Sequence, residues 1–288
     1  MANTLWQALT PRGQAIIEAI AANPDQTLVA SDFDGTLADI VSDPNAAHIH
    51  PDCARAFARL AGLVGQPAII TGRGLASVRE LGGLDDATGL ERLVVKAQYG
   101  VESWDAATGE VDEPPLPPQV ADAKDRVGQL LERLRAEGLD TDGVGLEDKG
   151  RALGVHTRNT SEPQAMLEHL RGPVDSIADE LGLHLEPGRF VLELRATPGT
   201  KAEALDQVWQ RGRHRVAVMI GDDLADVTAF EKLSELADQH GVQVAAIASA
   251  SAGEQPSVVE AADVQCEGPA GVAAWLDAVA DAVEARRN

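Results

Sequence analysis

Short apolar runs that end abruptly in polar side chains recur along this chain. Residues 27–30 read Thr-Leu-Val-Ala and lead directly into the acidic segment at 31–37, SDFDGTL. Residues 67–70 and 215–220 run into glycine and polar residues in the same way. Continuous apolar runs of this length are typical of strands buried on both faces, and the segments between them have helical spacing. The pattern therefore predicts an α/β fold built on a parallel sheet.

A proline-rich segment and a change in element order divide the chain. Residues 111–119, VDEPPLPPQ, contain four prolines and predict a semi-rigid linker. Hydrophobic spacing beyond it predicts helices over 120–138 and 163–181, each followed by a pair of strands, at 144–148 and 152–158 and at 183–186 and 190–195. This order differs from the strand–helix alternation on either side. We therefore expect a core domain formed by 1–112 and 193–288, and an inserted smaller α/β domain at 113–192.

Charge and composition exclude several classes of partner. The 288 residues include 24 Lys and Arg against 46 Asp and Glu, a formal net charge of −22. Because phosphate backbones and anionic membranes attract basic surfaces, we expect neither nucleic acid nor membrane as a partner. Two cysteines, Cys53 and Cys266, are too few for a disulfide framework. We find no apolar run long enough for a membrane span and no secretion signal, and expect a monomeric cytoplasmic protein.

Polar residues gather where the predicted strands end. Parallel α/β sheets bind their ligands in the crevice beyond the carboxyl ends of the strands. Any one of these residues could instead be a helix cap or a turn residue, but their ordered recurrence favours a site. The residues are Asp32 and Asp34, Thr71 and Arg73, Asp222 and Asp223, and Lys201 at the start of a helix.

These residue types suit phosphoryl transfer. Asp32, Asp34 and Asp222 offer the hard oxygen ligands that Mg²⁺ prefers. An aspartate can act as a covalent nucleophile toward phosphorus, and a second acid two residues away can protonate the leaving alcohol and later activate water. The Thr71 hydroxyl and the Lys201 ammonium would hold the phosphoryl oxygens.

The same residues resemble the four motifs of the haloacid dehalogenase-like phosphatases, in order. The resemblance implies that Asp32 is the nucleophile and that Asp34 is the general acid/base. It also implies a Mg²⁺ site formed by Asp32, Asp34 through its backbone carbonyl, and Asp222, supported by Asp223. Asp226, four residues beyond Asp222, is an alternative support for that site.

A narrower resemblance, to the trehalose-6-phosphate phosphatases, covers most of the chain. It rests on residues 31–51, on the Glu-x-Lys and His-x-Arg segments at 145–149 and 155–158, on 189–195, and on 220–226. It implies a Rossmann-like core with an inserted cap domain that closes over a disaccharide phosphate. Two positions differ from the family pattern. Ala225 stands where the family usually has Thr, and Tyr99 stands where the family commonly has His.

The resemblance also implies substrate contacts, each with a structural alternative. Glu147 and Lys149 share one face of a predicted strand, as do His156 and Arg158, and they could bind sugar hydroxyls or phosphate. The alternative is a charge-paired hairpin face that joins Glu147 to Lys149 or Arg158. The substrate residues that we predict are Arg73, Tyr99, Glu147, Lys149, His156, Arg158, Glu193 and Arg195. Arg73 could also pair with a neighbouring acid, Glu193 could pair with Arg195, and His156 could be structural.

The leading hypothesis is a Mg²⁺-dependent phosphatase acting on trehalose 6-phosphate. One alternative keeps the chemistry and changes the sugar, to sucrose 6-phosphate or glucosylglycerol phosphate. A different class, a catalytically silent sensor of sugar phosphates, is disfavoured because Asp32, Asp34 and Lys201 are all present. Residues 111–119 and the Pro198-Gly199 segment are the predicted hinges of the inserted domain.

Overall fold

The chain separates into two compact units. A computed structural model describes residues 5–41, 43–188, 190–196, 199–250 and 256–287. The first unit comprises Met1–Glu113 and Gly199–Asn288, and the second comprises Pro114–Pro198. The second unit extends beyond residue 192, where we expected the insertion to end, because strand β10 (Val191–Arg195) pairs with two strands of that unit.

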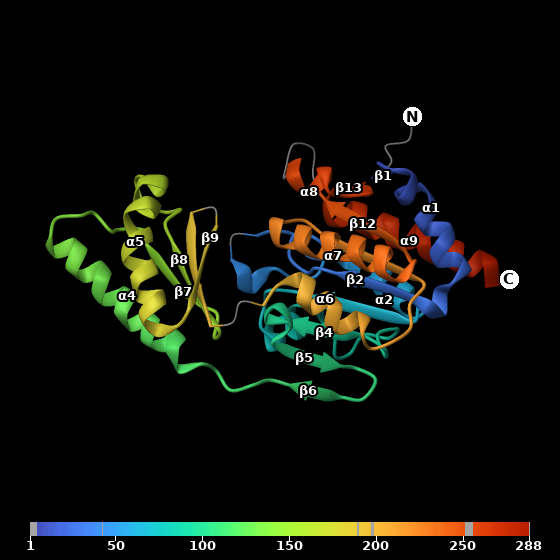
Figure 1. Ribbon diagram of the computed structural model, residues 1–288, viewed down its shortest axis with the longest axis horizontal. Helices are drawn as coiled ribbons and strands as arrows, with labels where there is room; N and C mark the ends of the chain where they lie inside the picture. Colours follow the sequence, from blue (N-terminus) through green and yellow to red (C-terminus); the bar gives the residue numbers. More distant parts are fainter. Residues whose placement is uncertain (1–4, 42, 189, 197–198, 251–255, 288) are drawn as a thin grey trace. The chain divides into compact units, whose positions relative to one another are not determined.

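A mostly parallel sheet of nine strands runs through the described part of the first unit (Figure 1). Its central strands are parallel, and antiparallel strands complete both edges. In spatial order the strands are β1 (Trp6–Ala8), β13 (Val264–Cys266), β12 (Gln243–Ser249), β11 (Val216–Gly221), β2 (Thr27–Ser31), β3 (Gln66–Ile70), β4 (Val94–Ala97), β5 (Glu102–Asp105) and β6 (Glu110–Asp112). The predicted α/β fold with a parallel sheet is confirmed.

Helices cover both faces of this sheet, which explains the continuous apolar strands. Val29 of β2 joins the core on one face, whereas Leu28 and Ala30 join the core on the other. The first face is covered by α1 (Pro11–Ala22), α2 (Pro51–Ala61), α3 (Leu75–Gly82) and α9 (Gly268–Arg287). The second is covered by α6 (Lys201–Trp209), α7 (Leu224–His240) and α8 (Pro256–Glu260). Short 3-10 helices lie at Pro24–Gln26 (η1), Pro44–Ala46 (η2) and Gln98–Gly100 (η3).

In its described residues, the second unit is a four-stranded antiparallel sheet with two helices on one face. The strand order is β7 (Gly145–Asp148), β8 (Ala152–His156), β10 and β9 (His184–Gly188). Helices α4 (Pro118–Ala136) and α5 (Pro163–Leu181) pack on Leu153, Val155, Leu192 and Leu194. Because side chains alternate along a strand, Gly154, His156 and Glu193 lie on the opposite face of the sheet.

The predicted linker at 111–119 includes residues that belong to the elements on either side of it. Strand β6 takes Val111 and Asp112, and α4 begins at Pro118. Proline is tolerated in the first turn of a helix because its missing N–H would have no helical partner there. The extended segment between the two elements is therefore 113–117.

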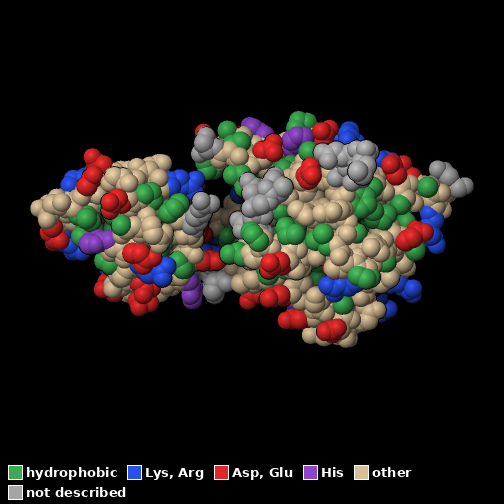
Figure 2. All heavy atoms as spheres, turned by 90° about the horizontal axis from the view of Figure 1, so that it is seen from above, with side chains coloured by type: hydrophobic (Ala, Val, Ile, Leu, Met, Phe, Trp, Pro, Cys, Tyr) green, Lys and Arg blue, Asp and Glu red, His purple; other side chains and the backbone are tan. Residues whose placement is uncertain are grey.

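The surface is acidic, as the composition requires. Figure 2 shows Asp and Glu side chains spread over the visible face of each unit, with Lys and Arg between them. Within the described ranges, no helix has the length and apolar content to cross a membrane.

Candidate active site

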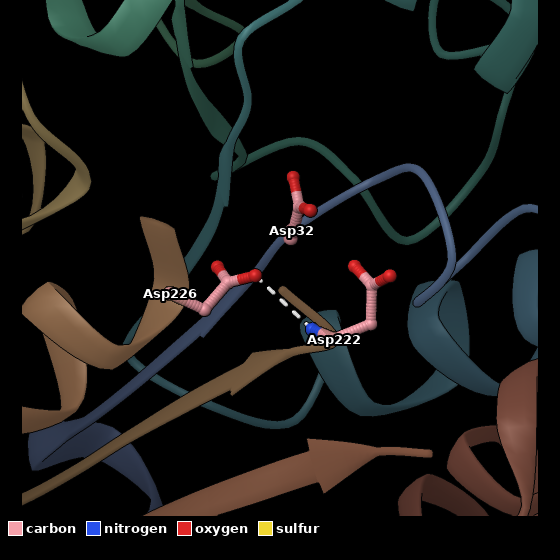
Figure 3. A group of neighbouring side chains, drawn as sticks. All are labelled: Asp32, Asp222 and Asp226. Atoms are coloured by element: carbon pink, nitrogen blue, oxygen red, sulfur yellow. Dashed lines mark hydrogen bonds between the residues drawn. The ribbon is translucent and has the colours of Figure 1, made fainter. Parts of the chain in front are cut away.

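Two neighbouring parallel strands carry the central acids. Strand β2 ends at Ser31, which pairs with Ile220 of β11, and the Asp32 N–H donates to the Ile220 carbonyl at 2.8 Å. Asp222 follows the last residue of β11. The register therefore brings Asp32 and Asp222 together at the carboxyl ends of these two central strands. Figure 3 shows both carboxylates there, beside that of Asp226.

Glycines allow these carboxylates to approach the backbone. Gly35 has a φ of +69°, and a Cβ there would lie 2.1 Å from Oδ2 of Asp222. A Cβ on Gly221 would lie 2.1 Å from Cγ of Asp226. Any larger residue at either position would displace an acid of the site.

Lys201 is the buried cation of the site. Its ammonium lies 2.8 Å from Oδ2 of Asp32, 2.8 Å from Oδ1 of Asp226 and 3.5 Å from Oδ1 of Asp223. A capping box formed by Thr200 and Glu203 fixes the start of α6, where Lys201 lies. Burial opposes the charge on Lys201, but the surrounding carboxylates outweigh it and raise the pKa of the ammonium well above its usual value.

Asp226 organises the loop that carries Asp222. Its Oδ2 accepts hydrogen bonds from the N–H groups of Asp222 (3.0 Å) and Asp223 (3.2 Å). Its Oδ1 accepts a hydrogen bond from the Lys201 ammonium. Asp223 is the N-cap of α7 and accepts the Asp226 N–H at 3.1 Å. The sequence placed Asp226 only as an alternative support, whereas here it is fully buried and joins Lys201 to the loop.

The clustered carboxylates fit a divalent cation. Burial raises the pKa of Asp32 to about 7 against the opposing charge of Lys201. Burial, with Asp226 and Asp223 nearby, raises the pKa of Asp222 to about 8. Oxygen atoms of Asp32, Asp222 and Asp226 all lie within 4.8 Å of one another. A hard cation would relieve this repulsion with the oxygen ligands that Mg²⁺ prefers.

Thr71, Arg73 and Asp34 meet beside this cluster. Thr71 follows β3, the neighbour of β2, and its hydroxyl accepts the Arg73 N–H at 3.1 Å. The Arg73 guanidinium binds both carboxylate oxygens of Asp34, at 2.6 and 2.5 Å. Pairing with an acid was the alternative to substrate contact for Arg73, and this pairing is present.

Tyr99 lies against the same loop. Gln98 and Tyr99 have φ values of 47° and 57°, and the Tyr99 N–H donates to the Thr71 carbonyl at 3.0 Å. A Cβ on Gly72 would lie 2.7 Å from the Tyr99 hydroxyl. Left-handed backbone at two consecutive non-glycine residues is costly, and such strain is concentrated at functional sites.

The other predicted substrate residues belong to the second unit, and all of them except Arg158 lie on the sheet face opposite α4 and α5. Glu147 binds His156 at 2.7 Å, and Lys149 binds Glu193 at 2.6 Å. Arg195 contacts Glu193 at 3.9 Å, and its guanidinium is hydrogen-bonded to Glu186. Among the described residues, this polar network includes His156 but not Arg158, which is exposed beyond the end of β8. The predicted segment 189–195 begins with Arg189, and the hinge segment with Pro198; both lie outside the described residues.

The sequence reasoning missed two members of this face. Glu186 and Gly154 are the register partners of Glu193, so Glu147, Gly154, Glu193 and Glu186 form one row across four strands. Gly154 leaves this row without a side chain at β8. These two residues could not be found from the sequence, because the sequence does not show which strands pair or in which register.

The fold is shared with solved hydrolases. The C-terminal domain of the C. albicans trehalose-6-phosphate phosphatase matches 97% of this chain and 99% of its own, with a TM-score of 0.74 at 20% identity. A haloacid dehalogenase-like hydrolase from Bacteroides thetaiotaomicron matches 87% of this chain and 98% of its own, with a TM-score of 0.56 at 16% identity. The chain therefore has the haloacid dehalogenase-like fold.

A sequence profile of the trehalose-phosphatase family matches residues 30–263. The chain belongs to this family, as its sequence predicted. It is 29% identical over 228 residues to a trehalose-phosphate phosphatase of Mycobacterium tuberculosis, covering 76% of this chain and 53% of that protein. It is 28% identical over 240 residues to a probable trehalose-phosphate phosphatase of Sinorhizobium fredii, covering 78% of this chain and 80% of that protein. An uncharacterized glycosyl hydrolase of M. tuberculosis is 32% identical over 213 residues, which is 69% of this chain and 15% of that protein.

Proposed function

We propose that this protein is a Mg²⁺-dependent phosphatase that converts trehalose 6-phosphate into trehalose and phosphate. The observation that carries the proposal is the buried Asp32 carboxylate, 2.8 Å from the Lys201 ammonium and clustered with Asp222. A carboxylate and a phosphate ester are both negatively charged and repel each other. Asp32 can therefore attack phosphorus only if nearby positive charge offsets this repulsion. Family membership supports the choice of a sugar phosphate.

In the first step, a carboxylate oxygen of Asp32 forms a bond to phosphorus while the bond from phosphorus to the sugar oxygen breaks. Lys201 holds Asp32 in place and stabilises the negative charge of the phosphoryl group. The Thr71 hydroxyl accepts from the Arg73 N–H, so its own proton is free to be donated to a phosphoryl oxygen. Asp34 gives a proton to the departing sugar oxygen.

In the second step, Asp34 takes a proton from water while the water oxygen forms a bond to the phosphorus of the aspartyl-phosphate. The bond from phosphorus to the Asp32 oxygen breaks, which releases phosphate and restores the Asp32 carboxylate. Asp32, Asp222 and the backbone carbonyl of Asp34 would hold Mg²⁺. Bound there, the ion would offset the repulsion between the acids and the phosphate. Asp226 and Asp223 then have positioning roles, since their oxygens already bind Lys201 and the backbone of the loop.

Sugar recognition falls to the polar face of the second unit and to Tyr99. Glu147 and Glu193 can accept hydrogen bonds from sugar hydroxyls, while Lys149, His156 and Arg195 can donate. Their mutual ion pairs hold these groups ready, and a sugar would exchange some of those pairs for its own hydroxyls. The monomeric state and the cytoplasmic location stay predictions.

Phosphate release from a panel of sugar phosphates, with Mg²⁺ and with EDTA, tests this function. We expect trehalose 6-phosphate to be preferred in kcat/KM over sucrose 6-phosphate and glucosylglycerol phosphate, and EDTA to abolish the release. A different preference would keep the chemistry and refute the disaccharide. If no substrate releases phosphate, the protein is better described as a silent sugar-phosphate binder.

The nucleophile is tested by Asp32→Asn. A neutral amide cannot attack phosphorus, so we expect turnover to be lost and no acid-stable phosphoenzyme to form from labelled substrate. Asp86→Asn changes an exposed aspartate of the same unit and should leave both signals intact. Turnover that persists in Asp32→Asn would refute the aspartyl-phosphate intermediate.

A further inference from the structure

The Arg73 side chain is held by several segments of the first unit. Its Nε and one terminal nitrogen donate to the two carboxylate oxygens of Asp34. Its other terminal nitrogen donates to the Pro44 carbonyl at 2.9 Å and contacts the Ser77 hydroxyl at 3.4 Å. The guanidinium carbon lies 5.7 Å from the centre of the Phe33 ring. These contacts occupy both edges of the guanidinium fork.

The backbone of Arg73 is equally fixed. Its N–H donates to the Thr71 hydroxyl, and its carbonyl accepts the Gln98 N–H at 2.8 Å. The Arg73 side chain is 14% exposed, whereas that of Asp34 is 39% exposed. The arginine is thus the anchored partner of the pair, and Asp34 is the partner that would otherwise be free to rotate.

We propose that Arg73 acts in the reaction through Asp34, as a positioning residue, rather than by binding the substrate. The inference rests on the proposed function, in which Asp34 transfers the proton of the leaving group. Two parallel hydrogen bonds fix the plane of a carboxylate as well as its position, which a single contact cannot do. The arginine thereby keeps the acid pointing to the place where the leaving oxygen departs.

The leaving group provides the test, because only a basic leaving group needs the proton that Asp34 supplies. Phenyl phosphate and 4-nitrophenyl phosphate are similar in size, but phenolate is much the more basic. For Arg73→Met we expect kcat/KM to fall on the order of tenfold to 100-fold with phenyl phosphate. With 4-nitrophenyl phosphate we expect a much smaller fall. Arg73→Lys, which keeps the charge but not the two-point contact, should behave like Arg73→Met.

Arg79→Met is the matched control. Arg79 lies on α3, which begins two residues after Arg73, and it also pairs with an aspartate, Asp85, but it lies outside the proposed site. We expect Arg79→Met to retain the wild-type kcat/KM for both aryl phosphates. Thermal unfolding of both variants separates a loss of fold from a loss of catalysis.

A double-mutant cycle with Asp34→Asn decides between positioning and direct binding. If Arg73 acts through Asp34, adding Arg73→Met to Asp34→Asn costs nothing further with 4-nitrophenyl phosphate or phenyl phosphate. Additive losses, or equal losses with both leaving groups in Arg73→Met alone, would overturn the inference in favour of substrate binding. A wild-type protein that releases no phosphate from any of these esters would instead refute the proposed function.

Discussion

His214 is a half-buried histidine for which the fold favours the neutral form. Its ring lies 5.0 Å from that of Trp209, and among the described residues no hydrogen-bond partner lies at its buried Nε2. Burial lowers the pKa of His214, although the Trp209 carbonyl opposes the shift. A proton on Nε2 would therefore add a buried donor with no acceptor, which costs stability.

The sign of the resulting pH dependence follows from linkage. Between the lowered native pKa and the ordinary value of about 6.5, the unfolded chain binds more protons at His214 than the folded chain does. Stability is therefore complete above that ordinary value and falls as the pH decreases below it. Between about pH 7.5 and about pH 5.5 we expect a smaller decrease in Tm for His214→Phe than for the wild type.

His48→Phe makes the same change at an exposed histidine of the first unit and should keep the wild-type difference in Tm between the two pH values. A His214→Phe protein whose Tm decreases as much as that of the wild type would show that His214 does not contribute to acid sensitivity.

At the scale of the element, the polar network on the sheet face opposite α4 and α5 depends on the absence of a side chain at Gly154. A Cβ on Gly154 would lie 2.9 Å from Nε2 of His156 and 3.5 Å from Oε2 of Glu147. Gly154→Ala should therefore disturb the Glu147–His156 pair and occupy the space between them. We expect kcat/KM for trehalose 6-phosphate to fall about tenfold or more, as for the loss of a charged hydrogen bond. Turnover of 4-nitrophenyl phosphate should change little.

Two further variants bracket this prediction. Glu147→Ala should show the same split between the sugar and aryl substrates, because it removes one member of the pair. Gly172→Ala, on α5, places a Cβ where, among the described residues, no atom beyond its chain neighbours and the backbone of its own helix lies within 4 Å, and should keep full activity with both substrates. Equal losses on both substrates in Gly154→Ala would exclude a role for this face in sugar recognition.

The sequence predicted the elements that have a strong pattern and missed those that depend on pairing. The apolar strands at 27–30 and 67–70 and the acids after them were found because burial on both faces leaves a continuous apolar run. Strand β5 has no such run, since Glu102–Asp105 alternates only partly and takes its place by pairing with β4.

Side-chain partners were predicted less well than strand positions, because the two partners of a pair are often far apart in sequence. Arg73 and Asp34 are 39 residues apart in sequence, and only the alignment of β2 and β3 brings their loops together. Asp226 was underestimated for a similar reason. Its role depends on two backbone N–H groups of the preceding loop. The contact with the Asp223 N–H belongs to a capping box at the start of α7, but the contact with the Asp222 N–H belongs to no such pattern.

At the scale of the whole molecule, the two units differ in how the chain builds them. The second unit is continuous, Pro114–Pro198, and has its own core of residues such as Val127, Leu153, Leu170 and Leu192. The first unit is assembled from two segments, and its site needs both, since Lys201 and Asp222 come from the second segment and Asp32 from the first. We therefore expect residues 114–198 to fold when expressed alone, with a cooperative thermal transition followed by circular dichroism.

Two comparisons make this prediction specific. Leu170→Ala should destabilise the isolated unit by about 2–5 kcal/mol, because Leu170 is fully buried in its core. Mg²⁺ at about 100 times its Kd should stabilise the first unit of the full chain by about 2.7 kcal/mol, yet leave the Tm of 114–198 unchanged, since the clustered acids lie in the first unit. An isolated 114–198 with no cooperative transition would mean that its core depends on the rest of the chain. If Mg²⁺ increased the Tm of this fragment, the second unit would bind the cation, which contradicts the proposed Mg²⁺ site in the first unit.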